Sequence, residues 1–145
     1  MALRVEALSA RLAKLDEIIA LLREFCAIDR SVLKDSPRDM LGVERALQLG
    51  AELILDIGNH ALSAQYGVHA TSYKEIVRLL GRQGVISESL AARLEKLGGF
   101  RNVLVHGYMD LDPEVVLDHL YKAPGDFSDF MAEIRTWLEG LALQP

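Results

Sequence analysis

The spacing of apolar residues constrains the fold of this chain more than any other feature of its sequence. In the first 26 residues, apolar side chains recur at intervals of three and four, at Val5, Leu8, Leu12, Leu15, Ile19, Leu22 and Cys26. These intervals are those of the a and d positions of a heptad repeat, and they predict one long helix with a narrow buried stripe. Such a stripe suits either a helix of a bundle or a dimerisation coiled coil, and we favour the bundle.

A second long helix is predicted from Pro37 to about Gln65. Ser36 is a suitable N-cap, Pro37 fits the first turn, and Asp39 faces the positive end of the helix. A helical projection places the polar residues on one face and apolar residues on the broad opposite face. The polar row consists of Arg45, Gln48, Glu52, Asp56 and Asn59.

Two interpretations of this polar row remain open. Rows of this kind are ordinarily solvated surface. However, leucines flank the row, and the like charges of Glu52 and Asp56 lie four residues apart, which is mildly destabilising on a helix. Gln48, Glu52, Asp56 and Asn59 therefore form either a solvent-exposed face or a supporting face for a ligand or a partner.

Serine residues mark the starts of two further helices. Ser72 and Glu75 have the spacing of a capping box and predict a helix that ends near Gly84. Ser87 is the expected N-cap of the next helix, whose apolar side is formed by Leu90, Leu94 and Leu97. This helix then meets the pair Gly98-Gly99, where it either continues or restarts.

The last third of the chain is predicted to hold three helical stretches. The first runs from Phe100 to His106, where Gly107 ends it. The second begins at Asp112, and the sequence Ala-Pro-Gly-Asp at 123–126 is expected to break the chain before a last helix from Phe127 to Leu141. No segment of the sequence alternates with period two. The prediction is an all-α chain, a four-helix bundle with additional short helices, in a single domain spanning residues 1–145.

Charge is distributed unevenly along the chain. The net charge of −5 and the pI near 5.3 exclude a protein that coats nucleic acid through bulk positive charge. Residues 71–107 nevertheless carry six basic side chains against three acidic ones, whereas residues 108–145 carry eight acidic against two basic. An anionic ligand would be attracted to residues 71–107, unless these charges are merely those of ordinary helix surfaces.

Several classes of protein are disfavoured. Cys26 is the single cysteine, so no internal disulfide or cysteine-based metal site is expected. The four histidines, His60, His69, His106 and His119, lack the spacing of a zinc enzyme. No signal peptide and no apolar run of membrane-spanning length is apparent, so we expect a reduced, cytoplasmic protein that does not bind membranes.

The most distinctive segment runs from Arg101 to Tyr108 and reads R-N-x-x-x-H-x-Y. Asn102 and His106 lie four residues apart and share a helix face. Arg101 lies about 140° around the helix from His106 and about 7.5 Å along it, so the two converge only if Arg101 bends back or if a second copy faces the first. This geometry favours a site assembled across a two-fold dimer. The alternative is that Arg101 is a surface charge, Asn102 a hydrogen-bonding residue near the helix end, and His106 a favourable partner of the helix dipole.

Together with the polar-faced helix before it and the turn Met109-Asp110-Leu111-Asp112 after it, this motif resembles that of the HEPN superfamily, and specifically of the HepT-like toxin family. The resemblance covers nearly the whole chain. It implies a compact helical bundle that forms a homodimer, pairs with a minimal nucleotidyltransferase antitoxin, usually MntA, and cleaves RNA without a metal or another cofactor. The family motif falls on Arg101, His106 and Tyr108, with Asn102 as the customary polar residue after the arginine.

The resemblance also implies a role for each motif residue. His106 would take the proton from an RNA 2′-hydroxyl or give one to the leaving 5′-oxygen. Arg101 would stabilise charge on the phosphate, and Asn102 would orient the phosphate or the imidazole. The products would be a 2′,3′-cyclic phosphate and a 5′-hydroxyl, from a tRNA or an mRNA. Tyr108 would receive AMP from the antitoxin.

Two interpretations other than a toxin remain open. The first is a partner or substrate-binding subunit of the nucleotidyltransferase, because some HEPN domains do not cleave RNA. The second is a helical dimer without catalytic function. A full set of Arg101, His106 and Tyr108 favours the toxin, because a scaffold has no evident need of all three.

Overall fold

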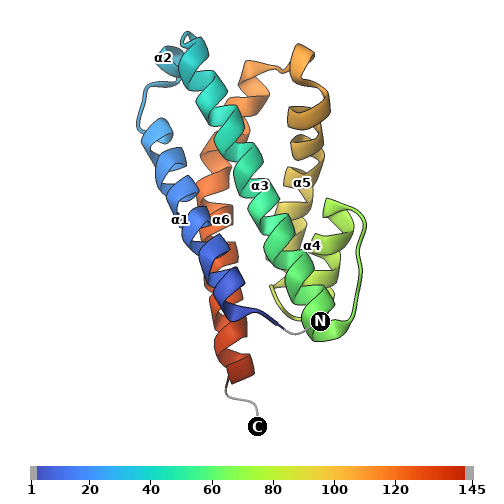
Figure 1. Cartoon of the computed structure of the whole chain (residues 1–145). Coiled ribbons are helices and arrows are strands. Elements are labelled where there is room, and N and C mark those ends of the chain that lie inside the picture. The colour runs from blue at the N-terminus through green and yellow to red at the C-terminus, as the bar shows by residue number, and fades with distance from the viewer. Residues whose placement is uncertain (1–2, 143–145) are drawn as a thin grey trace.

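The computed structural model describes residues 3–142, and all regular structure in that range is helical (Figure 1). The elements in chain order are α1 (Val5–Cys26), α2 (Arg30–Lys34), α3 (Pro37–Tyr66), α4 (Tyr73–Arg82), α5 (Glu88–His106), the short 3₁₀ helix η1 (Tyr108–Asp110) and α6 (Pro113–Ala142). The all-α prediction is confirmed. None of the helices in this range has the combination of length and apolar composition that a membrane span requires.

The predicted serine caps are confirmed at three helix starts. The hydroxyl of Ser36 accepts a hydrogen bond from the backbone N–H of Asp39 at 3.2 Å, and Ser72 and Ser87 do the same three residues ahead at 3.1 and 3.2 Å. Each of these bonds satisfies a donor that the first turn of a helix leaves without a partner. In a standard capping box, the glutamate accepts a hydrogen bond from the backbone N–H of the N-cap residue. At α4 the Glu75 carboxylate instead accepts from the backbone N–H and the hydroxyl of Thr71, one residue before the cap.

The expected break at 123–126 is wrong, because α6 continues through Pro124. A proline inside a helix leaves the carbonyl four residues earlier without its N–H partner, which here is the carbonyl of Leu120. The thiol of Cys26 on α1 donates to that oxygen at a Sγ–O distance of 3.7 Å. Burial also raises the pKa of this thiol, which keeps its proton in place. Pro124 itself is buried in the core, so packing and the thiol together offset the missing backbone bond.

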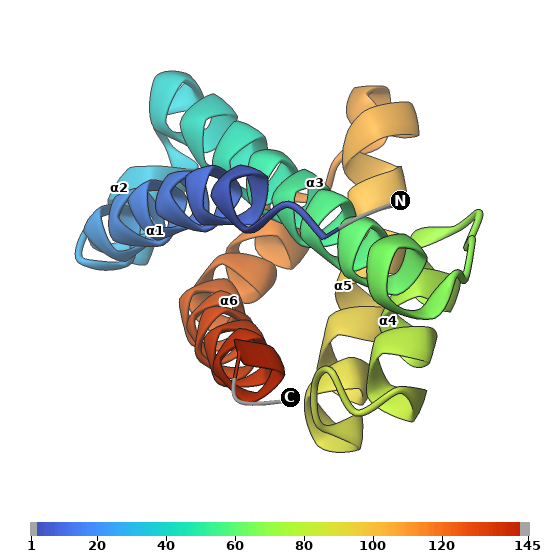
Figure 2. The same ribbon diagram turned by 60° about the horizontal axis from the view of Figure 1, so that its bottom comes forward.

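The helix α3 contacts all five other α-helices (Figure 2). α1 and α6 pack against it on one side, and α4 and α5 lie on the other. The buried side chains of all these helices form one hydrophobic cluster. Most of the predicted stripe of α1 belongs to it, but Val5 in the first turn remains 55% exposed, so the buried part begins at Leu8.

Three glycines let other elements approach α3 closely. Gly42, Gly50 and Gly58 lie eight residues apart and are covered by a phenylalanine from the end of α1, a phenylalanine of α6 and two aliphatic side chains of α4. A Cβ atom at Gly42 or Gly58 would lie 2.8 Å from the covering side chain, and one at Gly50 would overlap the ring of Phe127. The absence of side chains at these positions therefore sets how closely the helices pack.

Candidate active site

The motif residues occupy the last two turns of α5 and the start of η1. Asn102 and His106 are exposed on α5, and Tyr108 opens η1 with 69% of its surface exposed. Gly107 ends α5 by donating its backbone N–H to the carbonyl of Val103 at 2.8 Å. A Cβ atom at Gly107 would lie 3.1 Å from that oxygen, so glycine suits this tight exit from the helix. The exit places the Tyr108 side chain in solvent just beyond His106.

Arg101 is held by a carboxylate from another helix. Its Nε donates to Oε1 of Glu52 on α3 at 2.7 Å, and its Nη2 donates to the same oxygen. Its Nη1 donates to Oδ1 of Asn102 at 3.2 Å. The side chains of Arg101 and Glu52 are only 25% and 31% exposed, so water screens this ion pair incompletely.

The contacts of Arg101 leave part of its hydrogen-bonding capacity free. A guanidinium has five N–H groups, and three of them are used within residues 3–142, two by Glu52 and one by Asn102. The remaining two can bind an anion such as a phosphate without displacing Glu52. The arrangement therefore orients Arg101 and still permits it to bind a ligand.

Within one copy of the chain, the predicted site residues do not all contact one another. Arg101 and Asn102 are hydrogen-bonded to each other, but the hydrogen bonds of Arg101 within the described range do not include His106. Arg101 points to α3, whereas His106 shares the helix face of Asn102 and lies about 140° around α5 from Arg101. The two groups are thus presented separately by a single copy of the chain.

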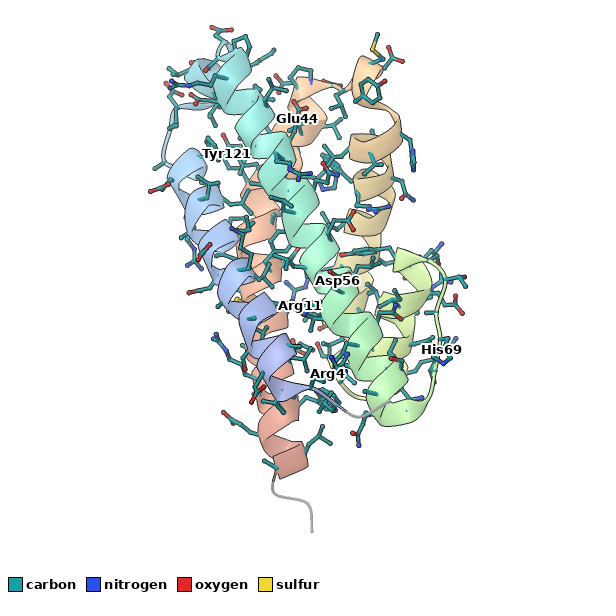
Figure 3. The ribbon with its side chains drawn as sticks, in the orientation of Figure 1. Arg4, Arg11, Glu44, Asp56, His69 and Tyr121 are labelled. Atoms are coloured by element: carbon teal, nitrogen blue, oxygen red, sulfur yellow. The ribbon has the colours of Figure 1, made fainter. Side chains whose placement is uncertain are left out.

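The polar row of α3 is divided between two surroundings. Glu52 reaches the motif through its ion pair with Arg101. Asp56 and Asn59 instead line a hollow of about 430 Å³ between α1 and α3, together with Arg4, Arg11 and His60. Figure 3 shows Arg4, Arg11 and Asp56 on this side of the molecule. Gln48, one turn before Glu52 on α3, is half-buried.

Sequence reasoning missed one residue that shapes the base of the site. Tyr73, at the first turn of α4, is buried, and its ring covers Gly98 so closely that a Cβ atom there would overlap it. Within residues 3–142 its hydroxyl has no hydrogen-bond partner. Burial, followed by the charge of Asp126, raises the pKa of this hydroxyl. The pair Gly98-Gly99 was the available signal, since a glycine within a helix often marks a close approach.

The ring of Phe100 beside the motif stacks on a histidine of α6. The centroids of Phe100 and His119 lie 3.9 Å apart, and burial lowers the pKa of His119, with a smaller contribution from the charge of Lys122. Within residues 3–142, no group of three His, Cys, Asp or Glu side chains is arranged as metal ligands would be.

Comparisons with known proteins match most of the chain. The family model described as Ribonuclease HepT-like matches residues 15–134. The tRNA nuclease HepT of Aphanizomenon flos-aquae is 28% identical over 132 residues, which cover 90% of this chain and 89% of that protein. The mRNA nuclease HepT of Shewanella oneidensis is 30% identical over 89 residues, which cover 61% of this chain and 67% of that protein.

A solved structure shares the fold over most of its length. The tri-AMPylated HEPN toxin of Shewanella oneidensis, determined in complex with an MNT antitoxin, superposes with a TM-score of 0.81 at 26% identity. The match covers 89% of this chain and 96% of that chain.

Proposed function

Because the chain belongs to the Ribonuclease HepT-like family, we propose that it is an endoribonuclease toxin that a partner nucleotidyltransferase antitoxin neutralises. The names of the two HepT relatives support cleavage of RNA, and the complex of the Shewanella oneidensis toxin supports the pairing with an antitoxin. The observation that carries the proposal is the ion pair of Arg101 with Glu52, which presents a guanidinium with free N–H groups beside Asn102.

In the proposed reaction, the catalytic groups are side chains of this chain. The 2′-oxygen of the RNA attacks the neighbouring phosphorus and the bond from phosphorus to the 5′-oxygen breaks. His106 takes the proton of the 2′-hydroxyl or gives one to the leaving 5′-oxygen, and water exchanges the other proton. The two free N–H groups of Arg101 bind the phosphate as negative charge increases on it. Asn102 orients the phosphate or the imidazole. The products are a 2′,3′-cyclic phosphate and a 5′-hydroxyl, and no metal takes part.

The proposed active form is a homodimer of four-helix bundles, with residues 1–145 forming one domain per copy. Arg101 is directed to α3 by Glu52, while His106 is exposed at the end of α5. The exposed apolar side chains of Val103 and Met109 lie at this end of α5, and a second copy would cover them. A two-fold arrangement then brings Arg101 of one copy close to His106 of the other.

Tyr108 is the proposed target of the antitoxin. Its phenolic oxygen attacks the α-phosphorus of ATP held by the nucleotidyltransferase, an O–P bond forms, and pyrophosphate leaves. The high exposure of Tyr108 makes its hydroxyl accessible to such an enzyme. AMP attached two residues after His106 adds a bulky anion where the RNA phosphate would bind, which blocks cleavage.

Induced expression of the protein in a bacterial host tests the proposed ribonuclease activity. Wild-type protein should arrest growth and degrade tRNA or mRNA, whereas His106→Ala and Arg101→Ala should do neither, and co-expression of the antitoxin should restore growth. Purified wild-type protein should cleave RNA in EDTA. Full cleavage by both variants would exclude the mechanism. If cells that express wild-type protein or either variant all grow without RNA damage, and the protein binds the antitoxin, the non-catalytic partner subunit would be favoured.

Intact mass spectrometry tests the modification separately. Incubation with the antitoxin and ATP should add mass in steps of AMP, and Tyr108→Phe should remove the gain. Tyr66→Phe is a suitable control, because this tyrosine is half-buried and its hydroxyl accepts a hydrogen bond from Trp137. A gain in mass that persists in Tyr108→Phe would assign the modification to another residue.

A further inference from the structure

One stripe of α5 connects the candidate active site to the start of α4. The residues at intervals of three and four along this stripe are Ala92, Glu95, Gly99, Asn102 and His106, so their Cβ positions share a helix face. The last two belong to the motif. The first four line a hollow of about 490 Å³, so the hollow adjoins the motif through Asn102.

The opposite wall of this hollow is formed by α4. Ser72, Tyr73 and Lys74 contribute to it, and Lys96 and Gly98 complete the α5 side. A second hollow of about 220 Å³ shares Ser72 and Lys74 and continues past Arg78 and Arg82. We call the two hollows together, from Asn102 to Arg82, the α4–α5 groove.

Gly99 keeps the α4–α5 groove open. Its neighbour Gly98 is explained by the Tyr73 ring that covers it, but a Cβ atom at Gly99 would meet no atom within 4 Å. A glycine inside a helix lowers helix stability relative to alanine, and no packing against the rest of the described chain requires one at this position. The missing side chain instead leaves bare backbone as the floor of the groove.

The groove also has an excess of positive charge in a chain of net charge −5. Four basic side chains line it, Lys74, Arg78, Arg82 and Lys96, against the carboxylates of Glu75 and Glu95. Arg78 donates to Glu95 at 2.9 and 3.3 Å, and the Nζ of Lys74 lies 3.5 Å from the same carboxylate. The bond from Arg78, followed by the charge of Lys74, lowers the pKa of Glu95. Glu75 is bound by Thr71. The groove therefore attracts an extended anion.

We propose that the α4–α5 groove binds the RNA strand next to the cleaved bond. This inference rests on the proposed ribonuclease function, in which the reacting phosphate lies at Arg101, Asn102 and His106. The neighbouring nucleotides pass over Gly99, with their phosphates near Lys74 and Lys96. At 1.5 Å per residue the α5 side extends about 15 Å from Asn102 to Ala92, which is longer than one nucleotide.

Direct binding measurements test the groove in the His106→Ala background, where RNA stays intact. Fluorescence anisotropy with a labelled single-stranded RNA of about 12 nucleotides gives affinity and its salt dependence. Lys74→Gln with Lys96→Gln should weaken binding about tenfold and reduce the slope of log K against log salt by about 0.7 for each phosphate that the variant no longer neutralises. The matched control is Lys14→Gln with Lys34→Gln, two exposed lysines on α1 and α2.

A second pair of variants tests the shape of the groove without changing charge. Gly99→Leu fills the groove and should increase helix stability while it weakens RNA binding about tenfold. Gly125→Leu is the control, because this glycine of α6 also has nothing within 4 Å of its Cβ position. Thermal unfolding confirms that both variants fold.

Cleavage assays distinguish the failure of this inference from failure of the proposed function. With otherwise wild-type protein, the groove variants should lose kcat/KM on the longer RNA and keep it on a dinucleotide, which ends before the groove. If the groove variants have the same affinity, salt slope and kcat/KM as the protein with an unaltered groove, the inference is wrong and the proposed ribonuclease function is unaffected. If wild-type protein cleaves no RNA, the ribonuclease fails and the binding measurements still decide the groove. Unchanged RNA binding with a weakened antitoxin complex would show a protein-binding groove and also overturn the inference.

Discussion

At the scale of single residues, Glu52 determines what Arg101 can do. One carboxylate oxygen accepts two of the five N–H groups of Arg101, which fixes the plane of the guanidinium on the α3 side of α5. An arginine free to rotate would lose side-chain entropy each time it bound a phosphate. Because Glu52 contacts Arg101, we propose that it is a positioning residue, which acts through Arg101.

Replacing Glu52 separates this positioning from simple binding. Glu52→Gln removes the charge that holds the guanidinium, and we expect kcat for RNA cleavage to fall about tenfold to a hundredfold, or about 1.4–2.7 kcal/mol, with a smaller change in KM. The matched control is Asp56→Asn, one turn further along the same face of α3 and lining a different hollow. Equal effects of the two substitutions, or a change in KM alone, would contradict a positioning role.

His119 should give the fold a sensitivity to mild acid. Burial against Phe100 lowers the pKa of this imidazole, so the unfolded chain binds its proton at a higher pH than the folded chain does. The stability from neutral His119 is therefore fully present above the ordinary histidine pKa of about 6.5 and is lost as the pH falls through the lowered folded value. The charged groups around it are Lys122 and Asp118 on α6, with Arg93, Lys96 and Asp126 lining the same hollow.

Urea unfolding at several pH values between 7.5 and 5 would measure this effect. His119→Phe should lose less stability than wild type as the pH falls, because it has no proton to take up. His69→Gln, in the exposed segment before α4, controls for the general effect of removing a histidine. Parallel pH curves for wild type and His119→Phe would contradict the assignment.

At the scale of elements, the glycines of α3 control helix packing. Gly50→Ala would place a methyl group within the ring of Phe127, which is fully buried. We expect a loss of about 1–3 kcal/mol in the free energy of unfolding. At Gly125 no atom of the described residues lies within 4 Å of the Cβ position, so Gly125→Ala should instead increase the free energy of unfolding by up to about 1 kcal/mol. Chemical denaturation measures both, and a stabilised Gly50→Ala would show that α6 can shift without cost.

α6 illustrates how tertiary contacts overrule a local signal. The sequence Ala-Pro-Gly-Asp is a strong helix breaker, but the segment stays helical because Pro124 is buried and Cys26 binds the carbonyl of Leu120. The start signals at Ser36, Ser72 and Ser87 did predict their helices, since an N-cap bond involves residues only three apart. Local signals are thus reliable here when the groups that satisfy them are local.

At the scale of the whole molecule, the proposed two-fold site predicts complementation. In a mixture of Arg101→Ala and His106→Ala proteins, each mixed dimer would have one site with both residues intact and one with neither. If the variants assemble at random, RNA cleavage should recover to about a quarter of the wild-type rate, although each variant alone is inactive. The measurement is cleavage after unfolding the two proteins together and refolding them.

Two results would oppose the shared site. No recovery with confirmed mixed dimers would place Arg101 and His106 of one chain in the same site. A monomer that cleaves RNA at the wild-type rate would exclude the dimer itself. Both results leave the ribonuclease function intact, because each of them concerns only its assembly.

The sequence alone determined the helical class, the limits of α1 and α3, the serine caps, and the segment from Arg101 to Tyr108 as the candidate for chemistry. It could do so because apolar periodicity, capping and motif spacing all act over a few neighbouring residues. The tertiary structure decided that Glu52 holds Arg101, that Tyr73 covers Gly98 while Gly99 stays open, and that Pro124 lies inside a continuous helix. Each of these depends on residues at least 25 positions apart. Their approach is set by how the helices pack, which no local pattern specifies.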